Sequence, residues 1–417
     1  MKKILVIGIL FSISLKTAVA QKKVNEIKIQ LSGFVRNDMV YNTRQVLSGR
    51  GEALVYLLPK PVKLDKEGMD INAVDNFNLT AISTRIRNKI IGGKIWNANI
   101  TASIEADFIG ANRYNAFMLR LRHAYIKLNW SKNHIIVGQY WHSLWSIECY
   151  PSPVSYGAAI PFNPLARVPQ IRFTQDIGAF KVIGTLMSSG MFKGKTSGAA
   201  LQNAIIPELN AQIQYKSKKT ATGAGINYKR LTPRIRTDSN YATTQTLNNV
   251  SYFIYLKHRN LFFTAKTYVL YGQSNDNAVL MGGYAVENKK YSEKEIQRNN
   301  LEYEAYNTLN LWVDIESNTK TIKYGIFVGY SKNLGSSKKI LVETFTGRWG
   351  NIASMYKIAP RIKYPINKLS LCFELDYTVV QYAEEGNDKE IYDDFGRVIA
   401  YHQVSNLKPT FTIIYSF

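Results

Sequence analysis

The sequence predicts an all-β fold, a transmembrane antiparallel β-barrel of about 16 strands. Three observations predict it: an N-terminal export signal, long segments in which apolar and polar residues alternate, and an aromatic residue at the end of the last such segment. The chain of 417 residues accordingly divides into a signal peptide, 1–20, and an outer-membrane β-barrel, 21–417.

The N-terminus has the three parts of a secretory signal peptide. Lys2 and Lys3 supply the positive start, residues 4–15 are apolar, and Ala18-Val19-Ala20 is an Ala-x-Ala cleavage pattern. The apolar part is too short to remain as a membrane anchor. We therefore expect an exported protein.

The amino-acid composition excludes several other classes of protein. The chain is rich in aromatic residues, which argues against disorder, and its two cysteines are too few for a disulfide scaffold. A formal net charge of +23 suits a nucleic-acid binder, but export removes nucleic acid as a partner. Loss of three lysines with the signal peptide leaves +20, which must lie in the lumen, at the rim and in the loops, because the lipid-facing band is neutral.

Period-two alternation predicts the strands. In Trp96–Phe108 the even positions are apolar and the odd positions are polar from Asn97 to Asp107, as expected of a strand with two unlike faces. Sixteen such segments are predicted: 27–41, 78–91, 93–108, 117–130, 133–142, 169–176, 178–189, 206–217, 221–231, 247–259, 261–273, 303–317, 321–332, 353–366, 368–382 and 404–417.

Short and long connections alternate between these segments. Ile91-Gly92-Gly93, Ser131-Lys132-Asn133 and Asn318-Thr319-Lys320 are expected to be short periplasmic turns. Residues 42–77, 143–168, 232–246, 274–302 and 383–403 are expected to be long extracellular loops. A secreted soluble β-sandwich or propeller is the alternative, although a propeller would repeat every ~40–50 residues, and no such repeat is apparent.

The last strand ends on an aromatic residue. Phe411, Ile413, Tyr415 and Phe417 alternate with Thr412, Ile414 and Ser416. This strand must close the barrel, because an open sheet edge is not stable in lipid. A terminal Phe417 on such a strand also resembles the signal read by the barrel assembly machinery. The implied partners are that machinery and outer-membrane lipids, and the implied location is the outer membrane of a Gram-negative bacterium.

Charged residues recur inside the predicted strands. A cation on the lipid face near the bilayer midplane costs ~2–4 kcal/mol, so we expect these residues to face the lumen. Rings of arginine there would favour anions. Structural ion pairs that brace the wall, or contacts with lipid phosphates at the rim, are the alternatives. The candidate pore-lining residues are Arg36, Arg85, Arg87, Glu105, Asp107, Arg120 and Arg122, with Asp38 beside Arg36.

The segment 145–170 is a second candidate site. Its five prolines exclude a central strand, and loops of this length often have a function. Folded inward, the loop would narrow the pore, with Tyr150, Tyr156, Phe162 and Arg167 as candidate constriction residues. An outward loop at a subunit contact or the rim is the alternative.

The sequence gives no reason to expect an enzyme, a metal site or a cofactor. Metal-ligand spacings, glycine-rich phosphate loops and Gly-x-Ser-x-Gly are absent. A His142-Ser143 dipeptide exists, but neighbours on a strand point to opposite faces. A phospholipase-like barrel enzyme and a non-conducting adhesin or scaffold barrel stay as alternatives. Whether Cys149 and Cys372 are free is left open.

From about residue 31 to 175 the chain resembles the DcaP-like family of trimeric outer-membrane porins. The motifs are 31–38 (LSGFVRND), 83–87 (STRIR), 106–110 (ADFIG), 119–125 (LRLRHAY) and 137–143 (VGQYWHS). The resemblance implies a sixteen-stranded homotrimeric porin for passive diffusion of small hydrophilic solutes, favouring anions such as dicarboxylates. It places Arg85, Arg87, Arg120 and Arg122 at the family's basic strand positions. Residues 21–26 are too short for the N-terminal coiled coil of some members.

Overall fold

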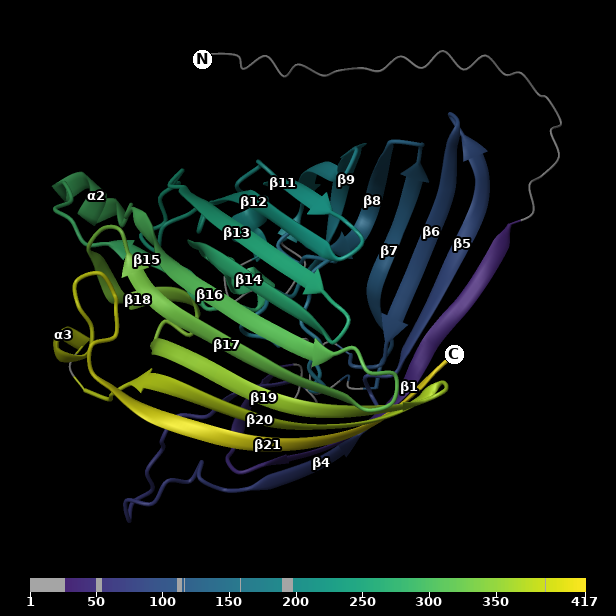
Figure 1. Cartoon of the computed structure of the whole chain (residues 1–417). Helices are drawn as coiled ribbons and strands as arrows, with labels where there is room; N and C mark the ends of the chain where they lie inside the picture. The colour runs from purple at the N-terminus through teal and green to yellow at the C-terminus, as the bar shows by residue number, and fades with distance from the viewer. Residues whose placement is uncertain are drawn as a thin grey trace.

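The structure is a computed structural model that describes residues 27–49, 55–110, 115, 117–157, 159–189, 198–386 and 388–417. Within them, sixteen antiparallel strands form a closed barrel (Figure 1), which confirms the predicted fold class. The barrel strands are β1 (Lys28–Asn42), β5 (Arg85–Ile95), β6 (Ala98–Asp107), β7 (Arg120–Asn129), β8 (Asn133–Trp141), β9 (Arg167–Ile177), β10 (Phe180–Met187), β11 (Glu208–Lys216), β12 (Thr220–Leu231), β13 (Leu247–Arg259), β14 (Phe263–Gln273), β16 (Tyr303–Ser317), β17 (Lys323–Ser336), β19 (Ile352–Ile366), β20 (Leu369–Ala383) and β21 (Tyr401–Ser416). The signal-peptide segment, 1–20, lies outside the described residues.

The barrel closes where the last strand meets the first. β21 pairs with β1 from Phe34↔Ser416 to Val40↔Thr410. Beyond β21, Phe417 and Gly33 exchange two backbone hydrogen bonds of 3.1 Å. The other edge of β1 pairs with β5 over Lys28–Phe34 and with the short strand β4 (Asn76–Thr80) over Asp38–Asn42. β1 is therefore covered on both edges.

Gly33 lets three strands meet at this seam. A Cβ atom added there would lie 2.2 Å from the Arg85 carbonyl oxygen and 2.9 Å from the Phe417 ring. We expect Gly33→Ala to destabilise the barrel by about 1–3 kcal/mol, the usual cost of overpacking. Heat-dependent gel mobility would measure this as a lower unfolding temperature.

Gly184→Ala on β10 is the matched control, because a Cβ there meets no atom within 4 Å. Equal unfolding temperatures for the two variants would contradict the crowding at the seam.

The wall has an apolar outer face. On β13, Tyr252 and Ile254 are 54% and 55% exposed, whereas Phe253 and Tyr255 are 4% and 1% exposed. Successive residues of a strand point to opposite faces, so the first pair is outside and the second inside. Further exposed apolar side chains of neighbouring strands are Ile171, Phe173, Val182, Leu186, Leu209, Ile213 and Ile226. An apolar exterior of this extent is typical of a wall in contact with lipid.

The two ends of the barrel differ in their connections. Seven turns of two to five residues lie at one end, the turn end, where both β1 begins and β21 ends. Connections of twelve or more residues lie at the other, the loop end, as predicted. Those connections contain β2 (Val46–Gly49), β3 (Val55–Pro59), β4, β15 (Gly282–Glu287), β18 (Ile340–Arg348), α1 (Gly198–Gln202), the 3-10 helix η3 (Asn275–Ala278), α2 (Glu293–Arg298) and α3 (Asp388–Ile391). None of the helices in the described ranges is long and apolar enough to cross a membrane.

The expected turn at Ile91-Gly92-Gly93 is wrong. β5 continues through the two glycines to Ile95, with a shift of register against β6 between Ile91 and Lys94. The chain reverses instead at Trp96 and Asn97, which both have positive φ. Two such residues form the tight turn that matches the twist of a hairpin. Trp96 is therefore in the turn and not on the strand.

An apolar core fills the part of the barrel interior beside β13 to β20. Inward side chains of β13 to β20 pack against residues of the long connections, among which Leu57, Leu58, Leu144 and Phe162 are buried. The wall supplies Phe253, Tyr255, Tyr268, Leu270, Trp312, Phe327, Met355 and Val380 to this cluster. The open space is thereby displaced toward the wall formed by β1 and β5 to β9.

Candidate functional site

The connection between β8 and β9, residues 142–166, folds into the barrel. The Tyr268 hydroxyl on β14 donates to the Leu144 carbonyl at 2.7 Å. The Trp312 indole N–H on β16 donates to the Asn163 side chain at 3.0 Å. These strands stand across the barrel from β8 and β9, so the loop crosses the lumen.

Carboxylates of the far wall hold this loop through its backbone. The Ser152 N–H donates to Asp314 at 2.9 Å, and the N–H groups of Val154 and Ser155 donate to Glu374 at 2.6 and 2.9 Å. Pro151 and Pro153 have no N–H, so the backbone donors of this stretch are those of Ser152, between the prolines, and of Val154 and Ser155, which follow them. Hydrogen bonds to a charged group are stronger than neutral ones, and the loop is therefore firmly anchored.

Strand register brings the predicted charges together on the opposite wall. Arg85 lies opposite Asp107, and Arg87 lies opposite Glu105, in the pairing of β5 with β6. On the other side of β6, Asp107 pairs with Arg120 of β7. The acidic strand is thus flanked by two arginine strands.

A bulge in β7 adds one more cation to this group. The register of β6 and β7 shifts so that His123 lies opposite Glu105 and Leu121 lies opposite Ala106. Arg122 is the extra residue, and both Arg122 and His123 are buried on the inner side. A β-bulge places two residues of one strand opposite one residue of its partner, so two successive side chains, here those of Arg122 and His123, can point to the same face.

The two carboxylates are fully buried beneath the arginines. Glu105 accepts from Arg122 at 2.6 Å and also pairs with Arg87 and, at 3.6 Å, with Arg85. Asp107 pairs with Arg120 at 2.5 Å and with Arg122 at 2.9 Å. Two anions are shared among four cations, so the cluster keeps a positive excess.

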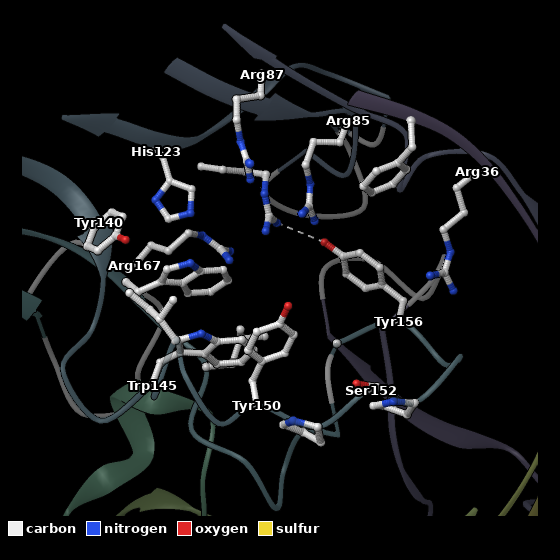
Figure 2. A pocket seen from close by; sticks show the side chains of 18 of the residues that line it. Arg36, Arg85, Arg87, His123, Tyr140, Trp145, Tyr150, Ser152, Tyr156 and Arg167 are labelled. Atoms are coloured by element: carbon white, nitrogen blue, oxygen red, sulfur yellow. Dashed lines mark hydrogen bonds between the residues drawn. The ribbon is translucent and has the colours of Figure 1, made fainter. Parts of the chain in front are cut away.

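Tyr156 connects the loop to this cluster (Figure 2). Its hydroxyl lies 3.2 Å from Asp107 and 3.3 Å from both Arg120 and Arg122. Burial opposes ionisation of the phenol, but the positive charges of Arg122 and Arg120 lower the pKa of Tyr156 below its ordinary value. The loop is therefore fastened to both sides of the lumen.

A cavity of about 580 Å³ remains between the loop and this wall. Figure 2 shows Arg85, Arg87 and Arg167 pointing into it from the strands, with Tyr150 and Tyr156 facing them from the loop, while Arg36 lies at its edge beside Tyr156. Its charged lining consists of Arg36, Arg85, Arg87, Arg122, Arg167 and Lys363. No carboxylate borders it among the described residues, because Glu105 and Asp107 lie behind the arginines.

The predicted pore-lining residues thus separate into two groups. Arg36, Arg85, Arg87 and Arg122 border the cavity, whereas Glu105, Asp107 and Arg120 form the layer beneath. Arg36 is held by Asp38 and by the loop, to whose Val154 carbonyl it donates at 2.6 Å.

The predicted constriction residues differ in position. Tyr150 and Tyr156 border the cavity from the loop. Phe162 does not: it is fully buried against Phe327 and Gly329, where it anchors the loop. Arg167 borders the cavity, but assigning it to the loop is wrong, because β9 begins at this residue.

An aromatic stack beside the loop was not predicted. Trp141 and Trp145 are stacked with ring centroids 4.4 Å apart, and Tyr150 continues the stack 5.6 Å from Trp145. The Arg167 guanidinium lies 5.0 Å from the Trp141 ring, a cation–π contact. The signal available in the sequence was the density of aromatic residues just before the prolines.

His142 is not arranged as a catalytic base. One ring nitrogen lies 3.0 Å from Glu208 and the other accepts from the Leu144 N–H at 3.2 Å. The Ser143 hydroxyl donates to Thr185 instead. Cys149 and Cys372 are free and buried, and the described residues contain no group of three potential ligands that could hold a metal.

No family model matches the chain, and no curated protein matches it. Among solved structures, the outer membrane channel DcaP of Acinetobacter baumannii aligns with a TM-score of 0.67 and 16% identity over 94% of this chain and 97% of that one. The anion-selective porin from Comamonas acidovorans aligns with a TM-score of 0.56 and 8% identity over 94% and 100%. OmpT of Vibrio cholerae aligns with a TM-score of 0.55 and 9% identity over 95% and 99%. The chain has the fold of these outer-membrane proteins, which confirms the resemblance to DcaP at the level of the fold.

Proposed function

We propose that this protein is an outer-membrane porin through which small hydrophilic anions, dicarboxylates among them, diffuse down their gradient. One observation carries the proposal: the cavity between the inward loop and the wall of β5 to β9 is lined by five arginines and a lysine, with Glu105 and Asp107 buried behind them. The apolar outer wall and the export signal support an outer-membrane location.

The lining would act through charge and hydrogen bonding. A small anion entering a narrow pore loses part of its hydration, and guanidinium groups replace it with charge-assisted hydrogen bonds. Glu105 and Asp107 offset part of the arginine charge, so an anion is attracted without being held too tightly to leave. The anchored loop would set the upper size of the solute.

Assembly and partners follow as further parts of the proposal. A trimer form is described for OmpT of Vibrio cholerae, and we propose a homotrimer for this chain on that likeness of fold. We also propose that Phe417, at the end of the closing strand, is read by the barrel assembly machinery. Lipids of the outer membrane would contact the apolar wall.

Reversal potentials in planar bilayers test the proposed function. With purified protein in a KCl gradient, we expect a reversal potential on the anion-selective side, and currents carried by a panel of organic mono- and dicarboxylates. Cation selectivity would overturn the proposal. A barrel without conductance that attaches cells through a ligand would indicate an adhesin, and lipid hydrolysis lost in His142→Ala would indicate an enzyme.

A further inference from the structure

A second, smaller cavity of about 240 Å³ in the lumen lies on the turn side of the larger one. Its lining includes His134, Thr174, Lys181 and Gln214, which flank the short turns. It shares four residues with the larger cavity: Tyr125, Tyr140, Trp145 and Ile147. The two cavities are therefore in series along the lumen. We call the second one the turn-side chamber.

The turn-side chamber has an excess of positive charge. Lys127 of β7, Arg172 of β9 and Lys181 of β10 line it, with Glu148 as the acid among its described lining residues. Glu148 is paired with Lys216 at 2.9 Å, and Lys181 with Asp176 at 3.3 Å. No salt bridge to Lys127 or Arg172 is formed within the described part of the chain.

Two buried donors of this chamber have no hydrogen-bond partner among the described residues. Arg172 is 5% exposed, and its Nε atom makes no hydrogen bond; the same holds for the hydroxyl of Thr174, which is 2% exposed. The rest of the guanidinium is fixed, because Nη2 donates to the Trp141 carbonyl at 2.7 Å and to Ser143 at 3.1 Å. An unpaired buried donor costs about 1–3 kcal/mol, which an incoming acceptor would recover.

We propose that the turn-side chamber is a second anion site, which takes one oxyanion group, a carboxylate or a phosphate, of a permeating solute. Arg172 and Thr174 supply its unpaired donors, and Lys127 and Lys181 supply its charge. This inference rests on the proposed function and adds a step to it. Two sites in series let an anion in the constriction be displaced by repulsion toward the chamber, which speeds its exit.

Block of chloride current by inorganic phosphate tests the second site. Phosphate is added at pH 7 to each side of the bilayer in turn, and the half-blocking concentration is read for each side. In Lys127→Gln/Lys181→Gln we expect the half-blocking concentration to rise about fivefold when phosphate is added to the side from which it blocks the wild type better. The reason is that the variant loses two partly screened positive charges. Thr174→Val, which keeps the shape of the side chain, should raise it about twofold.

Lys323→Gln/Lys368→Gln is the matched control, because it removes two positive charges from the turn end outside the chamber. Unchanged block in both double variants, or the same rise in both, would overturn the second site. Either result leaves the wild-type reversal potential as it was, so failure of the chamber is distinguishable from failure of the proposed function. A cation-selective wild type would overturn both.

Discussion

In Arg85→Gln/Arg87→Gln, the anion-to-cation permeability ratio is expected to fall about tenfold, equivalent to ~1.4 kcal/mol. Both side chains border the cavity of about 580 Å³, and they supply two of its six positive charges. The fold should survive, because Glu105 keeps Arg122 as its partner at 2.6 Å. Reversal potentials in a KCl gradient measure the ratio.

Lys94→Gln/Lys132→Gln is the control for this variant. Both lysines are exposed at the turn end and are absent from the cavity lining, so their loss changes the net charge equally but not the field in the pore. An unchanged ratio in a folded Arg85→Gln/Arg87→Gln barrel would mean that ions pass elsewhere. A fall of equal size in the control would assign selectivity to overall charge.

The strands were predictable because a membrane barrel imposes one rule on every strand. Outward positions must be apolar, so the alternation of apolar and polar residues identifies a strand in the sequence even where the strand's first and last residues are uncertain. The predicted strands differ from the observed ones only locally. The Gly92-Gly93 bulge prolongs β5 beyond the predicted turn. Strands β15 and β18 lie outside the lipid-facing wall, where no alternation is required. The resemblance to DcaP supplied the sixteen-strand expectation independently.

The charge cluster was predictable only in part. Alternation places Arg85 and Arg87 on one face, but it cannot reveal that a bulge turns both Arg122 and His123 inward. Nor can it say which charges border the cavity and which lie beneath, since that depends on the packing of the loop. The position of Phe162 was predicted wrongly for the same reason: the residues it packs against, Phe327 and Gly329, are more than 160 residues away along the chain.

Glu105→Gln is expected to have the largest effect on stability. Glu105 is fully buried and pairs with Arg85, Arg87 and Arg122. Removing its charge leaves Arg85 and Arg87 without their carboxylate beside Arg122, which keeps only Asp107. Breaking a buried ion pair in this way costs about 3 kcal/mol or more. Heat-dependent gel mobility should show a clearly lower unfolding temperature, while Thr101→Ala, four residues before Glu105 on the same face and only half-buried, should show a smaller change.

Although Glu105→Gln should lower stability, it should not lower the preference of the channel for anions. Glu105→Gln adds one net positive charge beside the cavity, so folded channels should keep or increase their preference for anions. Arg85→Gln/Arg87→Gln should lose that preference while staying stable. The proposed function requires opposite outcomes, because in it the carboxylate holds the arginines in place and the arginines attract the solute. A loss of anion preference in folded Glu105→Gln channels would contradict this division of roles.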